Sequence, residues 1–205
     1  MTTKYTYYFL DYSFSDLNLY NINSKHENII INLPFSEIEN LNLYDCDFDL
    51  SIFQHTKLNK LKKIDLSHTK VTDIKGLCGD VPFTNLKILN ISNNKSISNL
   101  GELKDAQFTG LKELYLSNDN LGDLNEINLS EYKFNYLQIL DLSNNHIEYL
   151  SPLKYLRNLK ELNLENNSIS DNKELFFIVD LNKYCTIKLF GNKVTGRDFG
   201  IFKMI

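Results

Sequence analysis

The feature that most constrains this sequence is an internal repeat with a period of about 24 residues. Two of its units read LKELYLSNDNL from Leu111 and LQILDLSNNHI from Leu137, so apolar residues recur at fixed places within each unit. Self-similarity at such a period is typical of architectures in which each unit buries the apolar face of its neighbour. Seven units begin at Ile38, Leu61, Leu86, Leu111, Leu137, Leu159 and Tyr184.

The spacing within each unit predicts one short β-strand per unit. Leu114 and Leu116 are two residues apart, as are Leu140 and Leu142, so the members of each pair point to the same side of a strand. Because the units run in one direction with a long return segment between strands, the strands are expected to pair in parallel. With about 4.8 Å between strands, seven units span roughly 30 Å, which favours an extended platform over a pocket.

These units resemble leucine-rich repeats, whose template is L-x-x-L-x-L-x-x-N-x-L. The match covers Ile38 to Val194, about three quarters of the chain. The resemblance implies an α/β solenoid. It would be a curved right-handed superhelix with a parallel β-sheet on its concave face and short 3₁₀ or irregular segments, with at least one helix, on its convex face. The convex halves are apolar at every third position, as at Ile147, Leu150 and Leu153. This is similar to the short intracellular class typified by a regulator of type-one protein phosphatase, and to bacterial internalins.

The ninth position of each unit turns the chain out of the strand. Asn suits this position because one amide supplies both donors and an acceptor to buried turn backbone. Cys46, Thr69 and Asp119 replace it in three units, and an ionised Asp only accepts hydrogen bonds. We therefore expect a ladder of stacked asparagines that is interrupted in the first units and at Asp119. The four asparagines of this ladder are Asn94, Asn145, Asn167 and Asn192.

One return segment differs from the others. Asp171 to Glu174 has the spacing of a capping box, and apolar residues follow it at helical spacing. This pattern predicts an α-helix over 172–183.

A solenoid exposes its apolar column at both ends, so the terminal segments are expected to cover it. Residues 1–37 are rich in Tyr and Phe and are predicted to form an N-terminal cap, which includes a degenerate eighth unit around Leu17 and Leu19. Residues 38–194 hold the seven repeats, and 195–205 are predicted to form a C-terminal cap.

The concave positions two, three, five, seven and eight are where binding specificity is expected. Rigid aromatic side chains on an exposed sheet are typical anchors of a protein interface, and carboxylates there can pair with basic groups. Charges at these positions nearly balance, so recognition should depend on shape and local pairs. Position two carries a basic stripe that is common in such repeats: Lys62, Lys87, Lys112 and Lys160. The predicted partner-binding residues are Tyr44, Asp65, His68, Ile88, Tyr115, Ile139, Asp141, Asn163, Glu165, Lys188 and Phe190.

Composition excludes several function classes. Twenty-two Lys and Arg against 26 Asp and Glu give a net charge of −4, which argues against nucleic acid as the main partner. No apolar run approaches the roughly 18 residues of a membrane helix, and the first residues lack the pattern of a secretory signal. Cys46, Cys78 and Cys185 are widely spaced and odd in number, which favours reduced thiols. We therefore expect no membrane contact, a cytoplasmic location and a monomer.

The sequence carries no catalytic or metal-binding motif. It contains no C-x-x-C, H-E-x-x-H, G-x-S-x-G or G-x-x-x-x-G-K pattern. Asp45, Asp47 and Asp49 alternate like the start of a calcium loop, but Leu50 stands where that loop needs glycine. We expect no enzyme activity, no metal and no cofactor.

Three hypotheses about function remain open. The favoured one is a protein-binding module or scaffold that uses the concave face. A second is a regulatory subunit of an enzyme such as a protein phosphatase, and it rests on analogy alone. A third is a secreted or surface recognition protein, as internalins are.

Overall fold

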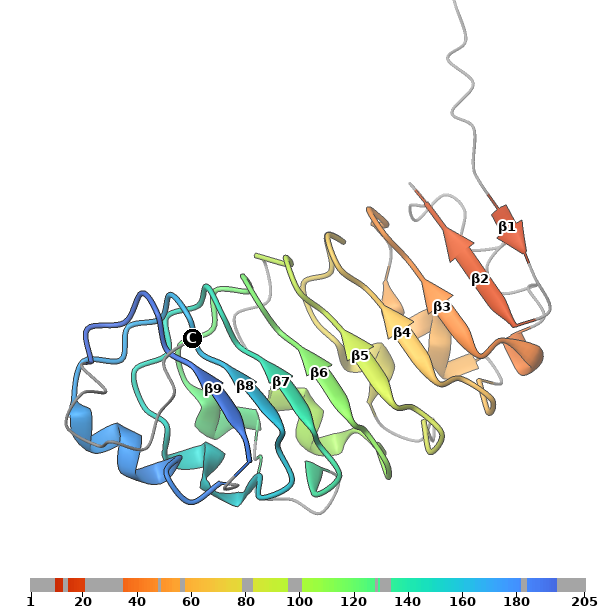
Figure 1. Cartoon of the computed structure of the whole chain (residues 1–205). Coiled ribbons are helices and arrows are strands. Elements are labelled where there is room, and N and C mark those ends of the chain that lie inside the picture. Colours follow the sequence, from red (N-terminus) through yellow and green to blue (C-terminus); the bar gives the residue numbers. More distant parts are fainter. Residues whose placement is uncertain are drawn as a thin grey trace, which may run out of the picture.

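The described part of the protein forms a single sheet of nine strands in sequence order, β1 to β9 (Figure 1). This computed structural model describes residues 10–12, 15–20, 35–47, 49–55, 58–78, 83–95, 101–127, 129, 134–181 and 184–194. Strands β1 and β2 are antiparallel, and β2 to β9 all pair in parallel. The strands are β1 (Leu10–Tyr12), β2 (Asp16–Leu19), β3 (Asn40–Asn42), β4 (Lys63–Asp65), β5 (Ile88–Asn90), β6 (Glu113–Tyr115), β7 (Ile139–Asp141), β8 (Glu161–Asn163) and β9 (Thr186–Lys188).

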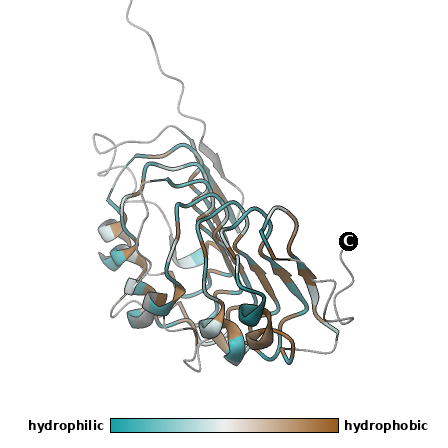
Figure 2. Ribbon diagram, turned by 90° about the vertical axis from the view of Figure 1, so that its left-hand side faces the viewer, coloured by the Kyte–Doolittle hydropathy of each residue, from teal (hydrophilic) through white to brown (hydrophobic). Residues whose placement is uncertain are grey.

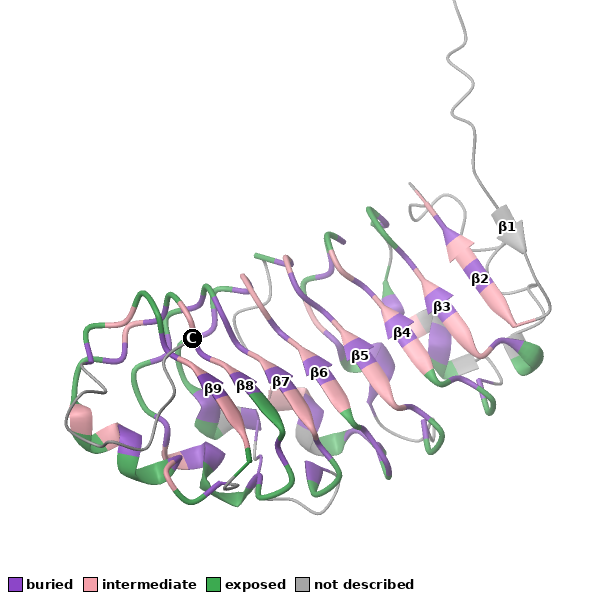
Figure 3. Cartoon of the chain, viewed as in Figure 1, coloured by how far each residue is buried: buried purple, intermediate pink, exposed green. Residues whose placement is uncertain are grey.

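Each strand from β3 to β9 buries its central residue and leaves the two flanking residues partly or fully exposed. The register aligns equivalent positions of successive units, so Leu89 pairs with Leu114 and Leu114 with Leu140. All three side chains are 0–1% exposed. Figure 3 shows these buried residues as a band across the middle of the strands. The predicted parallel sheet, with one apolar column behind it, is confirmed.

Short 3₁₀ helices lie on the other side of the coil, away from the sheet (Figure 2). Four phenylalanines from successive return segments are 0–1% exposed and belong to the core. The rings of Phe83 and Phe108 lie 6.3 Å apart between centroids. The helices are η2 (Phe35–Glu37), η3 (Leu50–His55), η4 (Lys75–Leu77), η5 (Gly101–Asp105), η6 (Leu124–Ile127), η8 (Ser151–Tyr155) and η9 (Asn172–Phe177). The phenylalanines are Phe53, Phe83, Phe108 and Phe134.

The α-helix predicted over 172–183 is wrong, because η9 is a 3₁₀ helix that ends at Phe177. Asp171 does cap its start, accepting a hydrogen bond from the backbone N–H two residues on at 2.8 Å. Glu174 serves the neighbouring unit instead of the capping box: its Oε2 accepts from the backbone N–H of Leu150 at 2.7 Å. A contact between units therefore replaces the local contact on which the helix prediction depended.

From Asn94 to Asn192 the ninth-position ladder is continuous in its accepting half. Oδ1 of Asn145 accepts from the backbone N–H groups of Asp119 and Leu121, both at 3.0 Å. Asp119 takes the same accepting role for Asn94 at 2.6 Å. Thr69 joins the ladder from the other side, since its Oγ1 donates to Oδ1 of Asn94 at 2.8 Å. The interruption predicted at Asp119 is therefore wrong for the acceptors, whereas in the first units the side chains of Thr69 and Cys46 act as donors, to Asn94 and to the carbonyl of Leu19.

The donating half of the ladder is interrupted at Asp119, as predicted. Nδ2 of Asn145 donates to the carbonyls of Leu116 and Leu142, at 2.7 and 3.0 Å. Asp119 has an oxygen, Oδ2, where the asparagines have this nitrogen. Oδ2 is buried and has no hydrogen-bond partner among the described residues. Burial raises the pKa of Asp119 to about 7 against the lowering effect of the N–H of Asn94, and the charge of Asp141 adds to the rise.

The sheet extends one unit further towards the N-terminus than the seven repeats. Leu17 pairs with Leu41 in parallel, and Leu17 and Leu19 are 0% and 2% exposed, so the predicted eighth unit contributes a strand and core side chains. The rest of the predicted N-terminal cap, apart from β1 and η2, lies outside the described residues. The C-terminal cap, 195–205, lies wholly outside them. The boundaries proposed for the caps stay a prediction.

Candidate partner-binding face

The exposed side of the sheet, called the concave face below, presents two rows of side chains. Because equivalent residues are in register, the third positions of the units form one row and the fifth positions form the other. From β3 to β9 the third-position row reads Asn40, Lys63, Ile88, Glu113, Ile139, Glu161 and Thr186. The fifth-position row reads Asn42, Asp65, Asn90, Tyr115, Asp141, Asn163 and Lys188.

Five of the eleven predicted binding residues line one hollow of about 230 Å³ across β6 to β9. It lies between the two rows, so its walls alternate between carboxylate, amide, aromatic and aliphatic groups. The predicted residues in it are Tyr115, Ile139, Asp141, Asn163 and Lys188, and the structure adds Leu140, Glu161 and Leu162.

Tyr115 is held by its own strand. Its hydroxyl donates to Oε2 of Glu113 at 2.9 Å. Partial burial, this hydrogen bond and the negative charges of Glu113, Glu161 and Asp141 raise the pKa of Tyr115 to about 12. The phenol therefore stays protonated at neutral pH, and the electrostatic field around it is negative.

Glu113 and Glu161 were missed by the sequence interpretation. Both are at position three, and each lies two residues before a predicted binding residue, Tyr115 and Asn163 respectively. Aligning the repeat units could have revealed Glu161, because the strand register places it one strand beyond Ile139 and beside the fifth-position row.

The fifth-position acids and amides also have a structural role. Oδ1 of Asp141 accepts from the backbone N–H of Ser143 at 2.9 Å, and Asn163 accepts from that of Glu165 at 3.1 Å. The side chain of the fifth residue thus closes the turn that follows the strand. Asp65 does the same and also accepts from the hydroxyl of Ser67 at 2.6 Å, so one of its oxygens is engaged within the fold.

The remaining predicted residues do not join the hollow. Tyr44 and His68 contact each other in the first units, with ring centroids 5.3 Å apart. Ile88 is half-buried on β5. Glu165 follows β8, and Phe190, after β9, is 71% exposed. The eleven residues therefore do not form one compact site.

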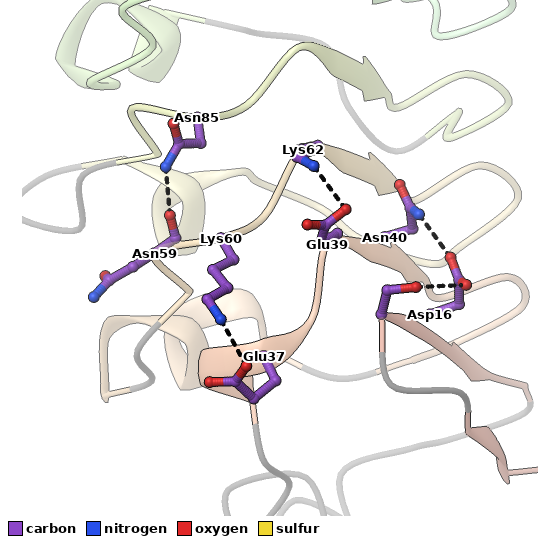
Figure 4. Close-up of polar contacts among 9 residues, drawn as sticks. Asp16, Glu37, Glu39, Asn40, Asn59, Lys60, Lys62 and Asn85 are labelled. Carbon is purple, nitrogen blue, oxygen red and sulfur yellow. Dashed lines mark hydrogen bonds and ion pairs between the residues drawn. The ribbon is translucent and has the colours of Figure 1, made fainter.

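A second hollow, of about 360 Å³, lies at the other end of the concave face and was not predicted. Its polar groups bond to one another: Oδ1 of Asp16 accepts from Nδ2 of Asn40 at 2.6 Å (Figure 4). Neighbouring units are joined nearby by ion pairs of 2.7 Å, from Lys60 to Glu37 and from Lys62 to Glu39. Lys62 thus uses its charge within the protein, which supports the structural interpretation of the basic stripe at its first member.

No group of three or more His, Cys, Asp or Glu side chains within the described ranges is placed to hold a metal ion. The alternating acids of the first turn are used locally, since Asp49 accepts from the N–H of Ser51 at 2.8 Å and Asp47 lies 3.9 Å from Nζ of Lys70. All three cysteines are free thiols. Burial and the charge of Glu161 raise the pKa of Cys185 to about 11, so that thiol is a poor nucleophile at neutral pH. None of the helices in the described part of the chain has the length and apolar character to span a membrane.

Comparison with known proteins identifies the class of this repeat. The family model for leucine-rich repeats, in its two-copy form, matches residues 137–175. The match identifies this stretch as leucine-rich repeats, and with the register and burial described above the fold is an α/β leucine-rich-repeat solenoid. A sequence search of curated proteins finds no significant match.

Solved structures share this fold. Internalin C2 from Listeria monocytogenes is 21% identical with a TM-score of 0.69, and the match covers 88% of this chain and 73% of that one. Human 5T4, a trophoblast glycoprotein, is 26% identical with a TM-score of 0.57, over 76% of this chain and 59% of that one. TLR13, in its complex with ssRNA13, is 23% identical with a TM-score of 0.60, over 77% of this chain and 22% of that one.

Proposed function

We propose that this protein binds a protein partner through its concave face and has no catalytic activity of its own. Leucine-rich repeats generally mediate protein–protein interaction, and solenoids of this kind offer an extended concave surface for it. The observation that carries the proposal is the hollow at Tyr115, where an aromatic ring, aliphatic groups and carboxylates meet on an otherwise polar sheet. Such mixed surfaces anchored by an aromatic side chain are typical of interface centres.

Size supports a protein partner over a small molecule. Pockets for drug-sized ligands usually measure about 300–1,000 Å³ and enclose the ligand. The hollow at Tyr115 has about 230 Å³ and opens onto the sheet face. It suits one side chain of a larger partner.

The experiment is a photo-cross-linking series in the native cell. A photoreactive residue placed at Tyr115 is expected to capture a protein that the same residue placed at Tyr149 does not, because Tyr149 is 59% exposed on a return segment. The variant Tyr115→Ala with Asp141→Ala should lose that partner in a pull-down, while the matched pair Tyr149→Ala with Glu148→Ala keeps it. Equal capture from both positions, or equal retention by both variants, would show that the concave face is not the binding surface.

We propose further that the protein is a monomer in the cytoplasm and that it does not bind nucleic acid. The free thiols of Cys46, Cys78 and Cys185 suit a reducing compartment. Cell fractionation tests the location, and sedimentation tests the oligomeric state. The similarity to TLR13 calls for a direct assay with single-stranded RNA, in which we expect no retardation at physiological salt.

A further inference from the structure

We propose that the hollow between Tyr115, Asp141 and Glu161 receives an arginine side chain from a basic segment of the protein partner. This inference rests on the proposed function and specifies the chemistry of the partner at one point. Three features carry it: the position of the carboxylates, their lack of an internal cation, and the fixed aromatic ring beside them.

The carboxylates are placed by strand register. Tyr115 and Asp141 are direct partners on β6 and β7, and Glu161 is the partner of Ile139 on the next strand. Adjacent parallel strands lie about 4.8 Å apart. The three residues therefore stand on three consecutive strands, and their side chains line the same hollow.

These acids have no ion-pair partner among the residues that the structure describes. The ion pairs formed there join Lys60 to Glu37, Lys62 to Glu39 and Lys70 to Asp47, all in the first units. Lys188 lines the far side of the hollow without pairing with Asp141 or Glu161. Two carboxylates and one ammonium group therefore line the hollow, and the carboxylate of Glu113 bonds to the hydroxyl of Tyr115, so negative charge is in excess there.

Tyr115 supplies a flat, preorganised surface. The hydrogen bond of its hydroxyl to Glu113 holds the ring and brings a further negative charge to it. A cation over such a ring is attracted by its π-electrons. Burial first, and then the hydrogen bond to Glu113 and the charges of Glu113, Glu161 and Asp141, raise the pKa of Tyr115 to about 12. The guanidinium of arginine is favoured over the ammonium of lysine because it both stacks on an aromatic ring and bonds carboxylates in a fork.

One oxygen of Asp141 remains available for such a bond. Oδ1 closes the turn by accepting from the N–H of Ser143, and no other described residue bonds to Oδ2. An asparagine at this position keeps the turn, as Asn163 does in the next unit. The variant Asp141→Asn therefore removes the charge and preserves the local fold.

The test is an NMR titration of the isotopically labelled protein with Nα-acetyl-arginine amide. We expect saturable shifts confined to β6, β7 and β8. The citrulline analogue has the same shape without the charge and should bind about tenfold more weakly, and the lysine analogue should lie between the two. Equal shifts from the arginine and citrulline analogues, or shifts spread evenly over the surface, would overturn the proposal.

Variants locate the effect. Asp141→Asn with Glu161→Gln should weaken binding of the arginine analogue by about tenfold, because both charges are lost. The control is Asp123→Asn with Glu148→Gln, which removes two exposed acids elsewhere; Asp123 also closes a turn, by accepting from the N–H of Asn125 at 2.8 Å. If both double variants weaken binding equally, binding depends only on the net charge of the protein, and the proposal is overturned.

The outcome is distinguishable from failure of the proposed function. If photo-cross-linking at Tyr115 captures a partner but the arginine and citrulline analogues bind alike, the concave face binds a protein by other chemistry. If the arginine analogue binds in the hollow but no partner is captured there, the proposed function fails while the site chemistry holds.

Discussion

The backbone N–H of Asn94 donates a hydrogen bond of 2.6 Å to Oδ1 of Asp119, which joins two neighbouring units through a carboxyl group that is 0% exposed. Equivalent asparagines use their second side-chain atom to donate to strand carbonyls, as Asn167 does to Leu142 and Leu164. Asp119 can donate in the same way only when its carboxyl group is protonated. The stability of the fold should therefore depend on pH through this residue.

Stability should fall as pH rises through the acid range towards neutrality. The pKa of Asp119 is raised from an ordinary value of 3.8 to about 7 in the folded protein. Between these values the folded chain binds a proton that the unfolded chain does not, so rising pH favours unfolding by up to about 1.4 kcal/mol per pH unit. Below pH 4 and well above pH 7 this residue adds no slope. Urea unfolding of the wild type and of an Asp119→Asn variant at pH 5, 6, 7 and 8 separates the contribution of Asp119 from that of other acids. If the free energy of unfolding of the two proteins changes with pH by the same amount, Asp119 is not responsible for the pH dependence.

Asp119→Asn should stabilise the protein above neutral pH. The new amide can donate to the carbonyls of Ile91 and Leu116, the positions equivalent to those that Asn145 uses. Satisfying a buried group that lacks a partner is worth about 1–3 kcal/mol. The gain should shrink as pH falls towards 5, because the protonated acid then makes a similar bond. Asn145→Asp is the reverse change and should destabilise the protein most at high pH.

Gly76→Ala should destabilise the convex side. Gly76 is buried in η4, and a Cβ built there would clash with the backbone oxygen of Leu50 in η3. Relieving that clash requires backbone movement, and overpacking of this kind typically costs about 1–3 kcal/mol. Gly122→Ala is the control, since no atom lies within 4 Å of the added methyl group. A shared small effect would mean that η3 and η4 do not pack as closely as described.

Phe108→Ala should lower the free energy of unfolding by about 3–5 kcal/mol, because it removes a fully buried aromatic ring from the core. The matched change Phe176→Ala removes a ring that is 60% exposed and should cost far less. Thermal unfolding followed by circular dichroism measures both. A similar loss for the two variants would place Phe176 in a hydrophobic contact of its own.

Much of the fold follows from repeated local spacing. A pair of buried apolar residues like Leu114 and Leu116 recurs in every unit. Its period was enough to predict where each strand lies, which side of the strand is buried and how neighbouring strands align. The helix over 172–183 failed because Glu174 bonds to Leu150 of another unit. A local capping pattern has no information about that competing contact.

Individual residues of the candidate site could be predicted, but which of them lie together in the fold could not. Tyr115 was predicted as an aromatic anchor, and Asp141 as a carboxylate able to pair with a basic group. Glu161 was not predicted, since its importance comes from lying one strand beyond Ile139 in the folded sheet. Asp119 was predicted to be a poor substitute for asparagine. That it keeps the accepting role and loses the donating one depends on which of its oxygens faces the N–H of Asn94.

The turn closed by the fifth residue of each unit has a consequence for how such a protein evolves. Asp141 and Asn163 accept the same backbone hydrogen bond, at 2.9 and 3.1 Å, so a single-nucleotide exchange between aspartate and asparagine leaves the fold intact. Natural selection can therefore alter the charge of the concave face one unit at a time. The repeat keeps its architecture while the pattern of charge on its concave face changes.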